Sequence, residues 1–251
     1  MTEFPEISLY MHRLGEWHSR QMEAIARLAG GSYTLHITCQ PGNVHVNMNR
    51  ALDRCCGRYT CLMDDDCIPL GAGWLEACIA MLREYPKFGI VAPVEIKDCT
   101  TLRTWFADPT TLIHEDAPPL LPAPWLPGYC MVIDRRRLPA IRVDENIVGD
   151  VGMSDLQLTL DARRSGFGVA HCTKVVVWHP FKGPCQPWQH ELNTRQCEYM
   201  RSKYGNLFDE VVQQSIPAIL RDPSVNLATL DPVKVEQYDE VICECSRRDS
   251  T

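Results

Sequence analysis

The stretch that decides the fold is Arg58-Tyr-Thr-Cys-Leu-Met-Asp64-Asp65-Asp66-Cys67-Ile68-Pro69. A short apolar run that ends in three carboxylates predicts a buried strand, which delivers acidic side chains to the open edge of a sheet where ligands bind in α/β folds. Carboxylates this close repel one another. A divalent cation that prefers oxygen ligands, such as Mg²⁺ or Mn²⁺ carrying a phosphate, relieves that repulsion. An acidic turn without a ligand is the alternative that these residues alone leave open.

The residues after the acids predict a helix and a second strand. Apolar side chains recur on one helical face at Trp74, Cys78, Met81, Leu82 and Tyr85. Pro86 ends this helix, and Phe88 to Val94 forms another apolar run with a proline inside it. The unit is therefore strand, acidic loop, helix, strand, which is typical of an α/β domain.

Two further strands are expected before the acids. Residues 7–11 and 33–39 are predicted strands, and a helix between them ends at Gly30-Gly31. Asn43 is placed to cap a following helix. The apolar stripe of that helix is Met48, Ala51, Leu52 and Cys55. A strand, helix, strand opening of this kind builds the parallel sheet of a nucleotide-binding half.

Periodicity is lost from residue 97 to residue 127, which predicts a long connection that contains Trp105 and Trp125. Trp125 is expected either to stack on a sugar ring or to pack in the core. Residues 128–137 then form an expected strand.

A helix follows, with Ser154 as its expected cap and Gly166 at its end. Asp155 falls in the first turn of this helix, where the helix dipole stabilises a carboxylate. Residues 169–178 are another predicted strand, followed at once by His179, and residues 181–190 are an expected flexible loop. A plain capping role for the helix-terminal residues and a structural role for the histidine are the alternatives.

Together these residues resemble the central signature of family 2 glycosyltransferases with the GT-A fold. The matching features are Asn47, Asn49, Gly57, the acidic triplet, Pro69, Gly73-Trp74-Leu75, Pro86 and Gly89-Ile-Val-Ala-Pro. The resemblance runs from about residue 5 to about residue 207. It implies a single Rossmann-like α/β domain over residues 1–207, with a mixed, mostly parallel central sheet flanked by helices. Residues 208–251 are then expected to form a C-terminal helix, over 209–220, and an extended tail.

The resemblance also implies an activity and a donor site. The implied enzyme is a glycosyltransferase of the hexosyltransferase type, which moves a sugar from a nucleotide-diphosphate sugar to an acceptor hydroxyl with inversion. Mn²⁺ or Mg²⁺ would be held by Asp64 and Asp66, and a histidine at the position of His179 commonly reaches the metal or the diphosphate. The nucleotide sugar, with UDP favoured over GDP, would contact Asp64, Asp65, Asn47 and Arg50. A simple surface role is the alternative for Asn47.

The catalytic base of inverting members corresponds to Asp155, because the family has an acidic pair before a Leu-rich helix. Ser154 stands in place of the first acid of that pair, which leaves Asp150 as a substitute. The resemblance places the acceptor site over the strand at residues 128–137, and the expected acceptor-binding residues are Trp125, Gly128, Arg135 and Arg142. The acceptor is expected to be a glycan, a small molecule or a hydroxymethylated base in DNA, the last gripped by Arg135, Arg136, Arg137 and Arg142.

Composition limits the function classes. The net charge of −7 over 251 residues argues against a broad nucleic-acid-binding surface. No apolar run approaches the roughly 20 residues of a membrane span, and the N-terminal residues lack the pattern of a secretory signal. A cytoplasmic protein is therefore expected.

The 13 cysteines contain no Cys-x-x-Cys pair. We expect buried, reduced thiols rather than a disulfide framework or a zinc site. Two rival functions remain open. One is a phosphatase of the haloacid dehalogenase type, whose Asp-x-Asp follows the first strand. The other is a carbohydrate- or nucleotide-sugar-binding protein that has lost turnover.

Overall fold

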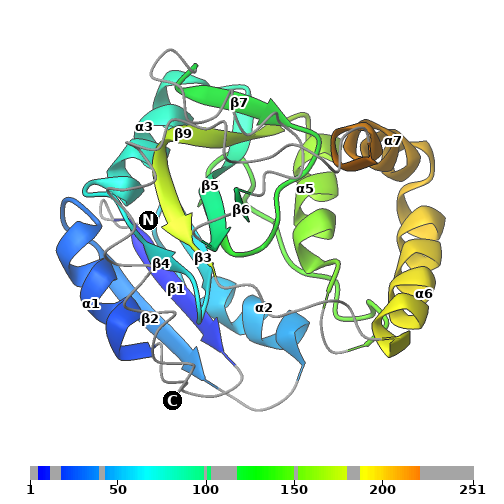
Figure 1. Ribbon diagram of the computed structural model, residues 1–251, viewed down its shortest axis with the longest axis horizontal. Coiled ribbons are helices and arrows are strands. Elements are labelled where there is room, and N and C mark those ends of the chain that lie inside the picture. Colours follow the sequence, from blue (N-terminus) through cyan, green and yellow to red (C-terminus); the bar gives the residue numbers. More distant parts are fainter. Residues whose placement is uncertain are drawn as a thin grey trace.

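The computed structural model describes residues 5–11, 18–39, 43–98, 101–102, 118–149, 152–179 and 187–220. It shows a central sheet covered by helices on both faces, as the sequence predicts (Figure 1). Trp105 and Asp150, which the sequence analysis singled out, lie outside the described residues, as does the expected tail after residue 220.

The sheet has the strand order β2-β1-β3-β8-β5-β9-β4, with β6 paired to β5 and β7 paired to β9. Its strands are β1 (Glu6–Met11), β2 (Thr34–Cys39), β3 (Tyr59–Asp64), β4 (Ile68–Pro69), β5 (Phe88–Asp98), β6 (Thr101–Leu102), β7 (Leu120–Ala123), β8 (Cys130–Asp134) and β9 (Gly168–Trp178).

Strands β2, β1, β3, β5 and β9 run in one direction, and β8 runs the opposite way between β3 and β5. The carboxyl ends of β1, β3, β5 and β9 therefore meet the amino end of β8 at one side of the sheet. We call this side, where Asp64, Trp178 and Cys130 lie, the carboxyl edge. It is the side on which open α/β sheets bind ligands.

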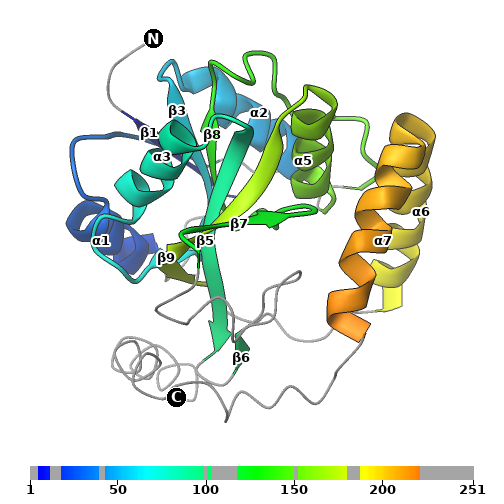
Figure 2. The same cartoon turned by 90° about the horizontal axis from the view of Figure 1, so that it is seen from above.

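The helices are α1 (His18–Leu28), α2 (Val44–Arg54), α3 (Trp74–Glu84), α5 (Ser154–Arg164), α6 (Pro187–Tyr204) and α7 (Asn206–Leu220). Helices α1 and α3 cover one face of the sheet, and α2 and α5 cover the other (Figure 2). Helices α6 and α7 form a further layer outside α5. One apolar cluster fills each interface between layers.

The two sheet faces are packed by the side chains that the sequence periodicity selected. Trp74 and Leu82 of α3 are fully buried against one face, while Met48 and Leu52 of α2 are buried against the other. The outer layer is held by a third cluster, in which Phe208 of α7 is 1% exposed. Burial of large side chains of this kind contributes about 1.5 to 3 kcal/mol each.

Asn43 caps α2 as predicted, because its side-chain oxygen accepts hydrogen bonds from the backbone of His45 and Val46. The prediction that Ser154 caps α5 is wrong. The cap position belongs to Met153, whose φ of 59° lies in the left-handed region, and Ser154 is the first helical residue and is buried. A left-handed backbone at a non-glycine residue costs free energy, and such strain clusters at functional sites.

Two other expectations need correction. The segment expected to lack periodicity contains strands: β5 continues to Asp98, and β6 and β7 fall within the same stretch. Edge pairing with β9 orders β7 even though it contains a proline, which is tolerated on an edge strand. The expected flexible loop to residue 190 is shorter, since α6 already begins at Pro187.

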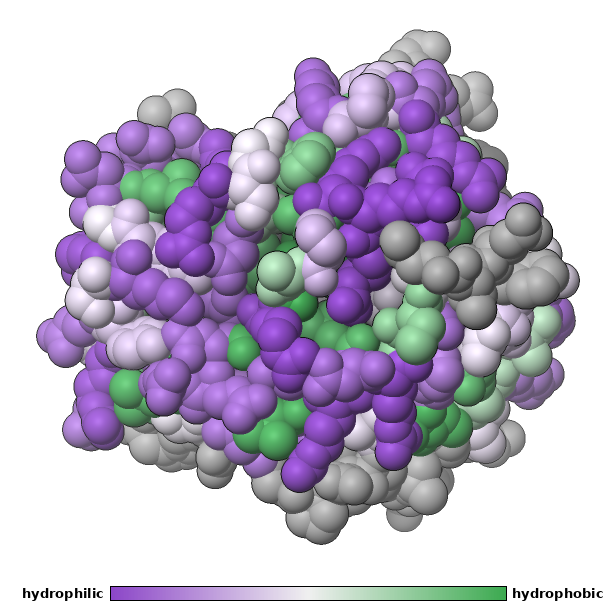
Figure 3. Space-filling model, turned by 180° about the vertical axis from the view of Figure 1, so that it is seen from behind, coloured by the Kyte–Doolittle hydropathy of each residue, from purple (hydrophilic) through white to green (hydrophobic). Residues whose placement is uncertain are grey.

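The face of the molecule seen in Figure 3 is mostly hydrophilic, with apolar residues in small separate patches. Eight cysteines have described side chains, of which six are buried and none is in a disulfide, which confirms the expectation of reduced thiols for these eight residues. Within the described residues, no helix is long and apolar enough to cross a membrane.

Candidate active site

The acidic turn lies at the carboxyl edge between β3 and β4. Gln21 of α1 holds this turn, because its side-chain amide donates to the backbone oxygen of Asp64 at 2.5 Å and to that of Cys67 at 2.9 Å. The Cys67 backbone N–H also donates to the Asp64 oxygen, at 3.3 Å. Hydrogen bonds that fix the backbone on both sides of the acids orient their side chains before any ligand arrives.

His179 joins the acids because it directly follows β9, and the pairing of Ile68 with Trp178 brings the two segments together. The Nε2 atom of His179 lies 3.1 Å from Oδ1 of Asp66 and 3.7 Å from Oδ2 of Asp64. One ligand atom from each of these three residues lies within 4.8 Å of the others. The structure therefore brings together the three residues that the sequence analysis assigned to a metal.

Glu95 of β5 completes this group, and the sequence analysis missed it. Its Oε1 atom lies 2.6 Å from Nδ1 of His179, and Glu95 is 1% exposed. A carboxylate on one ring nitrogen fixes the tautomer of a histidine and directs the other nitrogen toward a metal. Although burial disfavours the charged ring, hydrogen bonds to Asp66 and Glu95 raise the pKa of His179 to about 9.

The donor set fits a divalent cation. Two carboxylates and one imidazole, with a carboxylate behind the imidazole, match the ligands of Mn²⁺ or Mg²⁺ sites, with room for phosphate oxygens and water in the remaining positions. Without a cation, two neighbouring carboxylates repel each other, and the charged form of His179 compensates them only in part.

Asp155 lies in the first turn of α5 and faces the loop before β8. Its Oδ2 atom accepts a hydrogen bond from the Gly128 backbone N–H at 3.2 Å, and its Oδ1 atom accepts one from the Leu156 N–H at 2.8 Å. Burial outweighs these hydrogen bonds and raises the pKa of Asp155 to about 6. A carboxylate that titrates near neutral pH is suited to accept a proton from a substrate.

Tyr129 connects Asp155 to the acidic turn. Its backbone oxygen accepts from the Asp64 N–H at 3.0 Å, its hydroxyl donates to the Pro93 oxygen at 2.7 Å, and its ring centroid lies 5.9 Å from that of His179. Because Gly128 and Tyr129 are consecutive, the Asp155 carboxylate lies within about 13 Å of the Asp64 amide. Gly128 and Tyr129 thus contact both the candidate base and the turn that carries two of the candidate metal ligands.

The other donor-site candidates lie on two elements at the carboxyl edge. Asp65 is half-buried in the acidic turn. Helix α2 begins at this edge, and its Arg50 side chain donates to Asn47 at 3.2 Å. Asn47 is 1% exposed, so the alternative of a simple surface role for Asn47 is wrong.

The arginines expected at the acceptor site lie at the opposite side of the sheet. Because β8 is antiparallel to β3, Asp134 pairs with Tyr59, and Arg135 follows at the far end from Gly128. The Arg135 backbone N–H donates to the Arg58 oxygen, and its guanidinium donates to the Leu52 oxygen at 3.2 Å.

Arg142 is also held by the scaffold, in an ion pair with the exposed Asp53. Trp125 is half-buried and packs against the cluster of α5, α6 and α7. The structure therefore does not bring Arg135 and Arg142 together with Gly128 and Asp155.

Several solved structures are similar to this chain. GalNAc-T7, solved with UDP, GalNAc and Mn²⁺, matches with a TM-score of 0.54 and 9% identity, over 71% of this chain and 44% of that one. S. aureus TarS matches with a TM-score of 0.56 and 10% identity, over 90% of this chain and 44% of that one. S. aureus TarS 1–349 in complex with UDP-GlcNAc matches with a TM-score of 0.57 and 11% identity, over 85% and 72%.

No protein-family model matches the sequence, and no curated protein matches it significantly. The chain spans less than half the length of two of the solved chains. At this low identity the likeness shows the fold alone. The chain has the mixed α/β architecture of the GT-A glycosyltransferase fold, as the sequence predicts.

Proposed function

We propose that this chain is a metal-dependent glycosyltransferase that transfers a sugar from a nucleotide-diphosphate sugar to an acceptor hydroxyl. The observation that carries the proposal is the assembly of Asp64, Asp66 and His179 at the carboxyl edge, with Asp155 bonded to Gly128, whose neighbour Tyr129 accepts a hydrogen bond from the Asp64 backbone. On a GT-A fold, an acidic cluster and a carboxylate with a raised pKa at one edge supply a donor site and a base.

Asp64, Asp66 and His179 would hold Mn²⁺ or Mg²⁺, which when bound neutralises negative charge on the departing diphosphate. Glu95 keeps the His179 ring in the orientation that ligation needs. Asp65, the third acid of the turn, would contact the nucleotide sugar. UDP is favoured over GDP as the nucleotide, since UDP or UDP-GlcNAc is named with two of the similar solved chains.

Asn47 and Arg50 are the donor-site candidates on α2. The hydrogen bond between them holds the amide and the guanidinium in a fixed relation at the helix that begins beside the site. A guanidinium is the cation best matched to a diphosphate, because its planar N–H groups bind phosphate oxygens in pairs.

Asp155 would remove the proton of the acceptor hydroxyl while the sugar carbon inverts in a single displacement. Its raised pKa makes it a stronger base than an ordinary aspartate, and the Gly128 N–H holds its carboxylate in place. Asp150 is the substitute base if Asp155 serves only to order the loop.

A glycan or a small molecule is the proposed acceptor, with Gly128 beside the base and Trp125 within the same loop. If a hydroxymethylated DNA base is the acceptor, basic side chains near the site have to bind the DNA phosphates. Arg135 and Arg142 lie away from the carboxyl edge and bind the scaffold, so a DNA acceptor has no geometric support from them.

The test is one panel of assays on the full chain with Mn²⁺. UDP- and GDP-sugars are offered with glycan, peptide, small-molecule and hydroxymethylated-DNA acceptors, and hydrolysis of the donor and of simple phosphate esters is measured alongside. The proposal predicts metal-dependent donor hydrolysis or transfer and no hydrolysis of simple esters. Turnover of simple esters would favour the phosphatase, and metal-dependent nucleotide-sugar binding without turnover would favour the degenerate binding protein.

A further inference from the structure

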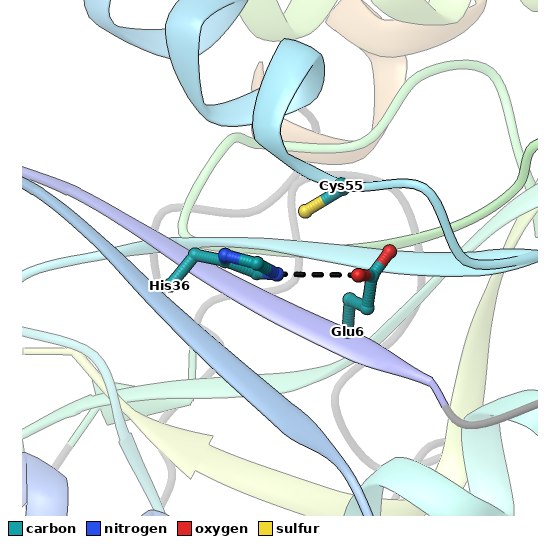
Figure 4. Close-up of side chains that lie close together, drawn as sticks. All are labelled: Glu6, His36 and Cys55. Atoms are coloured by element: carbon teal, nitrogen blue, oxygen red, sulfur yellow. Dashed lines mark hydrogen bonds and ion pairs between the residues drawn. The ribbon is translucent and has the colours of Figure 1, made fainter. Parts of the chain in front are cut away.

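A second cluster of potential ligands lies on the side of the sheet away from the carboxyl edge. Glu6 begins β1, His36 lies on β2, and Cys55 directly follows α2. Glu6 pairs with Thr34, and because side chains alternate along a strand, His36 points to the same face as Glu6. Figure 4 shows the carboxylate, the imidazole and the sulfur directed toward one another.

The ligand atoms of this cluster lie close enough for one metal ion to bind all three after small side-chain movements. The His36 Nε2 atom lies 3.2 Å from Oε1 of Glu6, and one ligand atom from each of the three residues lies within 4.8 Å of the others. Ligands bonded to zinc at about 2.0 to 2.3 Å in tetrahedral geometry lie roughly 3.3 to 3.8 Å apart. Small side-chain rotations would close the remaining gap.

The surroundings support ligation. Glu6 and Cys55 are 4% and 6% exposed, whereas the His36 side chain is 23% exposed, which gives an ion and one water access to the cluster. The Gly57 N–H donates to Oε2 of Glu6 and so holds the carboxylate with Oε1 toward His36. A hydrogen bond of this kind on a ligating carboxylate is what orients the ligand in known metal sites.

We propose that Glu6, His36 and Cys55 bind Zn²⁺, with water in the fourth position. A thiolate, an imidazole and a carboxylate together select zinc rather than Mg²⁺ or Mn²⁺, which prefer oxygen ligands. The ion would join β1, β2 and the connection from α2 to β3, so its role is to stabilise this half of the sheet.

The zinc site is separate from the candidate active site. Glu6 pairs with Thr60 and Tyr10 pairs with Asp64, so the two clusters are four residues apart along β1. This separation is about 13 Å at the rise of a strand. The active-site cluster contains no cysteine, and a thiolate signal therefore distinguishes the two sites.

The experiment is a titration of the reduced full chain with Co²⁺, a spectroscopic substitute for Zn²⁺, followed by competition with Zn²⁺. The wild-type chain is expected to show a sulfur-to-cobalt charge-transfer band that saturates at one equivalent and is displaced by Zn²⁺. Cys55→Ala removes the band. Cys56→Ala, which changes the exposed neighbouring cysteine, keeps it.

Asp66→Ala also keeps the band, because it alters only the active-site cluster, so failure of the proposed function leaves this result unaffected. A band of wild-type intensity in Cys55→Ala overturns the proposal. So does the absence of any band in the wild-type chain.

A second measurement covers the case in which Cys55→Ala does not fold. His36 is partly exposed, so His36→Gln removes a ligand with little effect on packing. Zn²⁺ raises the Tm of the wild-type chain, since a ligand that binds the native state stabilises it. The proposal predicts that His36→Gln weakens Zn²⁺ binding at least about tenfold and loses most of this Tm shift. An equal shift in both proteins contradicts it.

Discussion

At the scale of single residues, Asp155 carries the most specific claim. A general base contributes about 10²- to 10⁴-fold, so Asp155→Asn is expected to lower kcat for transfer by that factor while donor affinity stays unchanged. The wild-type rate should rise with pH through the pKa of about 6, because the base acts only when deprotonated. Transfer at the wild-type rate by Asp155→Asn, together with its loss in Asp150→Asn, would move the assignment to Asp150.

Asp155→Asn should lower the rate of transfer, but it should raise the stability of the folded chain above about pH 6. The pKa of Asp155 is raised on folding, so its favourable contribution is fully present below the unfolded value of 3.8 and is lost as the pH rises through about 6. At pH 8 the charge on the half-buried Asp155 costs up to about 3 kcal/mol. Asp155→Asn should therefore unfold at a higher temperature than the wild-type chain at pH 8, and the two should converge near pH 4.

Glu95 is the residue that the sequence analysis could not find. The apolar run ends at Val94, and nothing in the neighbouring sequence indicates that Glu95 meets a histidine 84 residues later. The pairing of β5 with β9 produces that contact, and long-range strand pairing is not encoded in local periodicity. By contrast, Asp64 and Asp66 are identifiable because the acids directly follow their own strand.

Glu95→Gln tests the orienting role. The substitution keeps the size of the side chain but weakens its hydrogen bond to His179, so the apparent affinity for Mn²⁺ should fall about 10- to 100-fold. Transfer is measured as a function of Mn²⁺ concentration, and saturating metal is expected to restore most of the rate. Glu23→Gln, on the exposed face of α1, is the matched control. An unchanged Mn²⁺ dependence in Glu95→Gln would refute the role.

At the scale of elements, the direction of β8 determines which of the expected acceptor-binding residues lie near Asp155. Residues 128–137 were expected to form a strand beneath the acceptor site, and β8 occupies Cys130–Asp134. Its antiparallel orientation puts Gly128 beside Asp155 and puts Arg135 at the far end. Hydrophobic pattern identifies a strand but not its direction in the sheet, so the sequence could not separate these two ends.

Gly128→Ala tests the contact between Gly128 and Asp155, which lies just before the amino end of β8. A Cβ at this position would lie 3.3 Å from the Cβ of Asp155, so Gly128→Ala displaces the base by a few tenths of an ångström. Misplaced catalytic groups lose rate steeply, and a fall in kcat of about tenfold is expected with unchanged nucleotide affinity. Gly71→Ala is the control, because a Cβ there has nothing within 4 Å. Equal rates in the two variants would contradict the proposed contact.

The attachment of α6 depends on Asp144. Lys203 and the Tyr199 hydroxyl, both on α6, donate to its carboxylate at 2.6 Å and 2.5 Å. Burial opposes ionisation, but these hydrogen bonds hold the pKa of Asp144 well below its usual value. Its stabilising contribution is therefore present above the unfolded pKa near 4 and is lost as the pH falls further.

Asp144→Asn should consequently lower stability at pH 7 by about 1.5 to 3 kcal/mol, which is the usual range for hydrogen bonds to charged groups. Thermal unfolding at pH 7 and below pH 4 measures the effect, and the difference from the wild-type chain should shrink at the lower pH. A difference that does not depend on pH would exclude the ionised carboxylate as its source.

At the scale of the whole molecule, the order of strands and helices up to β5 follows from the sequence except for the two-residue strand β4, because each of the other elements carries its own apolar stripe. The N-terminus of α5 does not follow, since Ser154 is a good capping residue and only tertiary packing places Met153 in the cap position with a left-handed backbone. The helix expected over 209–220 corresponds to α7, but the position of α6 and α7 outside α5 depends on the contacts of Phe208 and Met200.

The most direct test of the central claim is a calorimetric titration of UDP into the full chain with Mn²⁺. The proposed site predicts binding by the wild-type chain that disappears with a chelator and weakens at least about 100-fold in Asp66→Ala, because the removed carboxylate is a metal ligand. Asp209→Asn, which breaks only an exposed ion pair with Arg201, should bind like the wild-type chain. UDP binding of equal strength in Asp66→Ala, or in the presence of the chelator, would contradict the account.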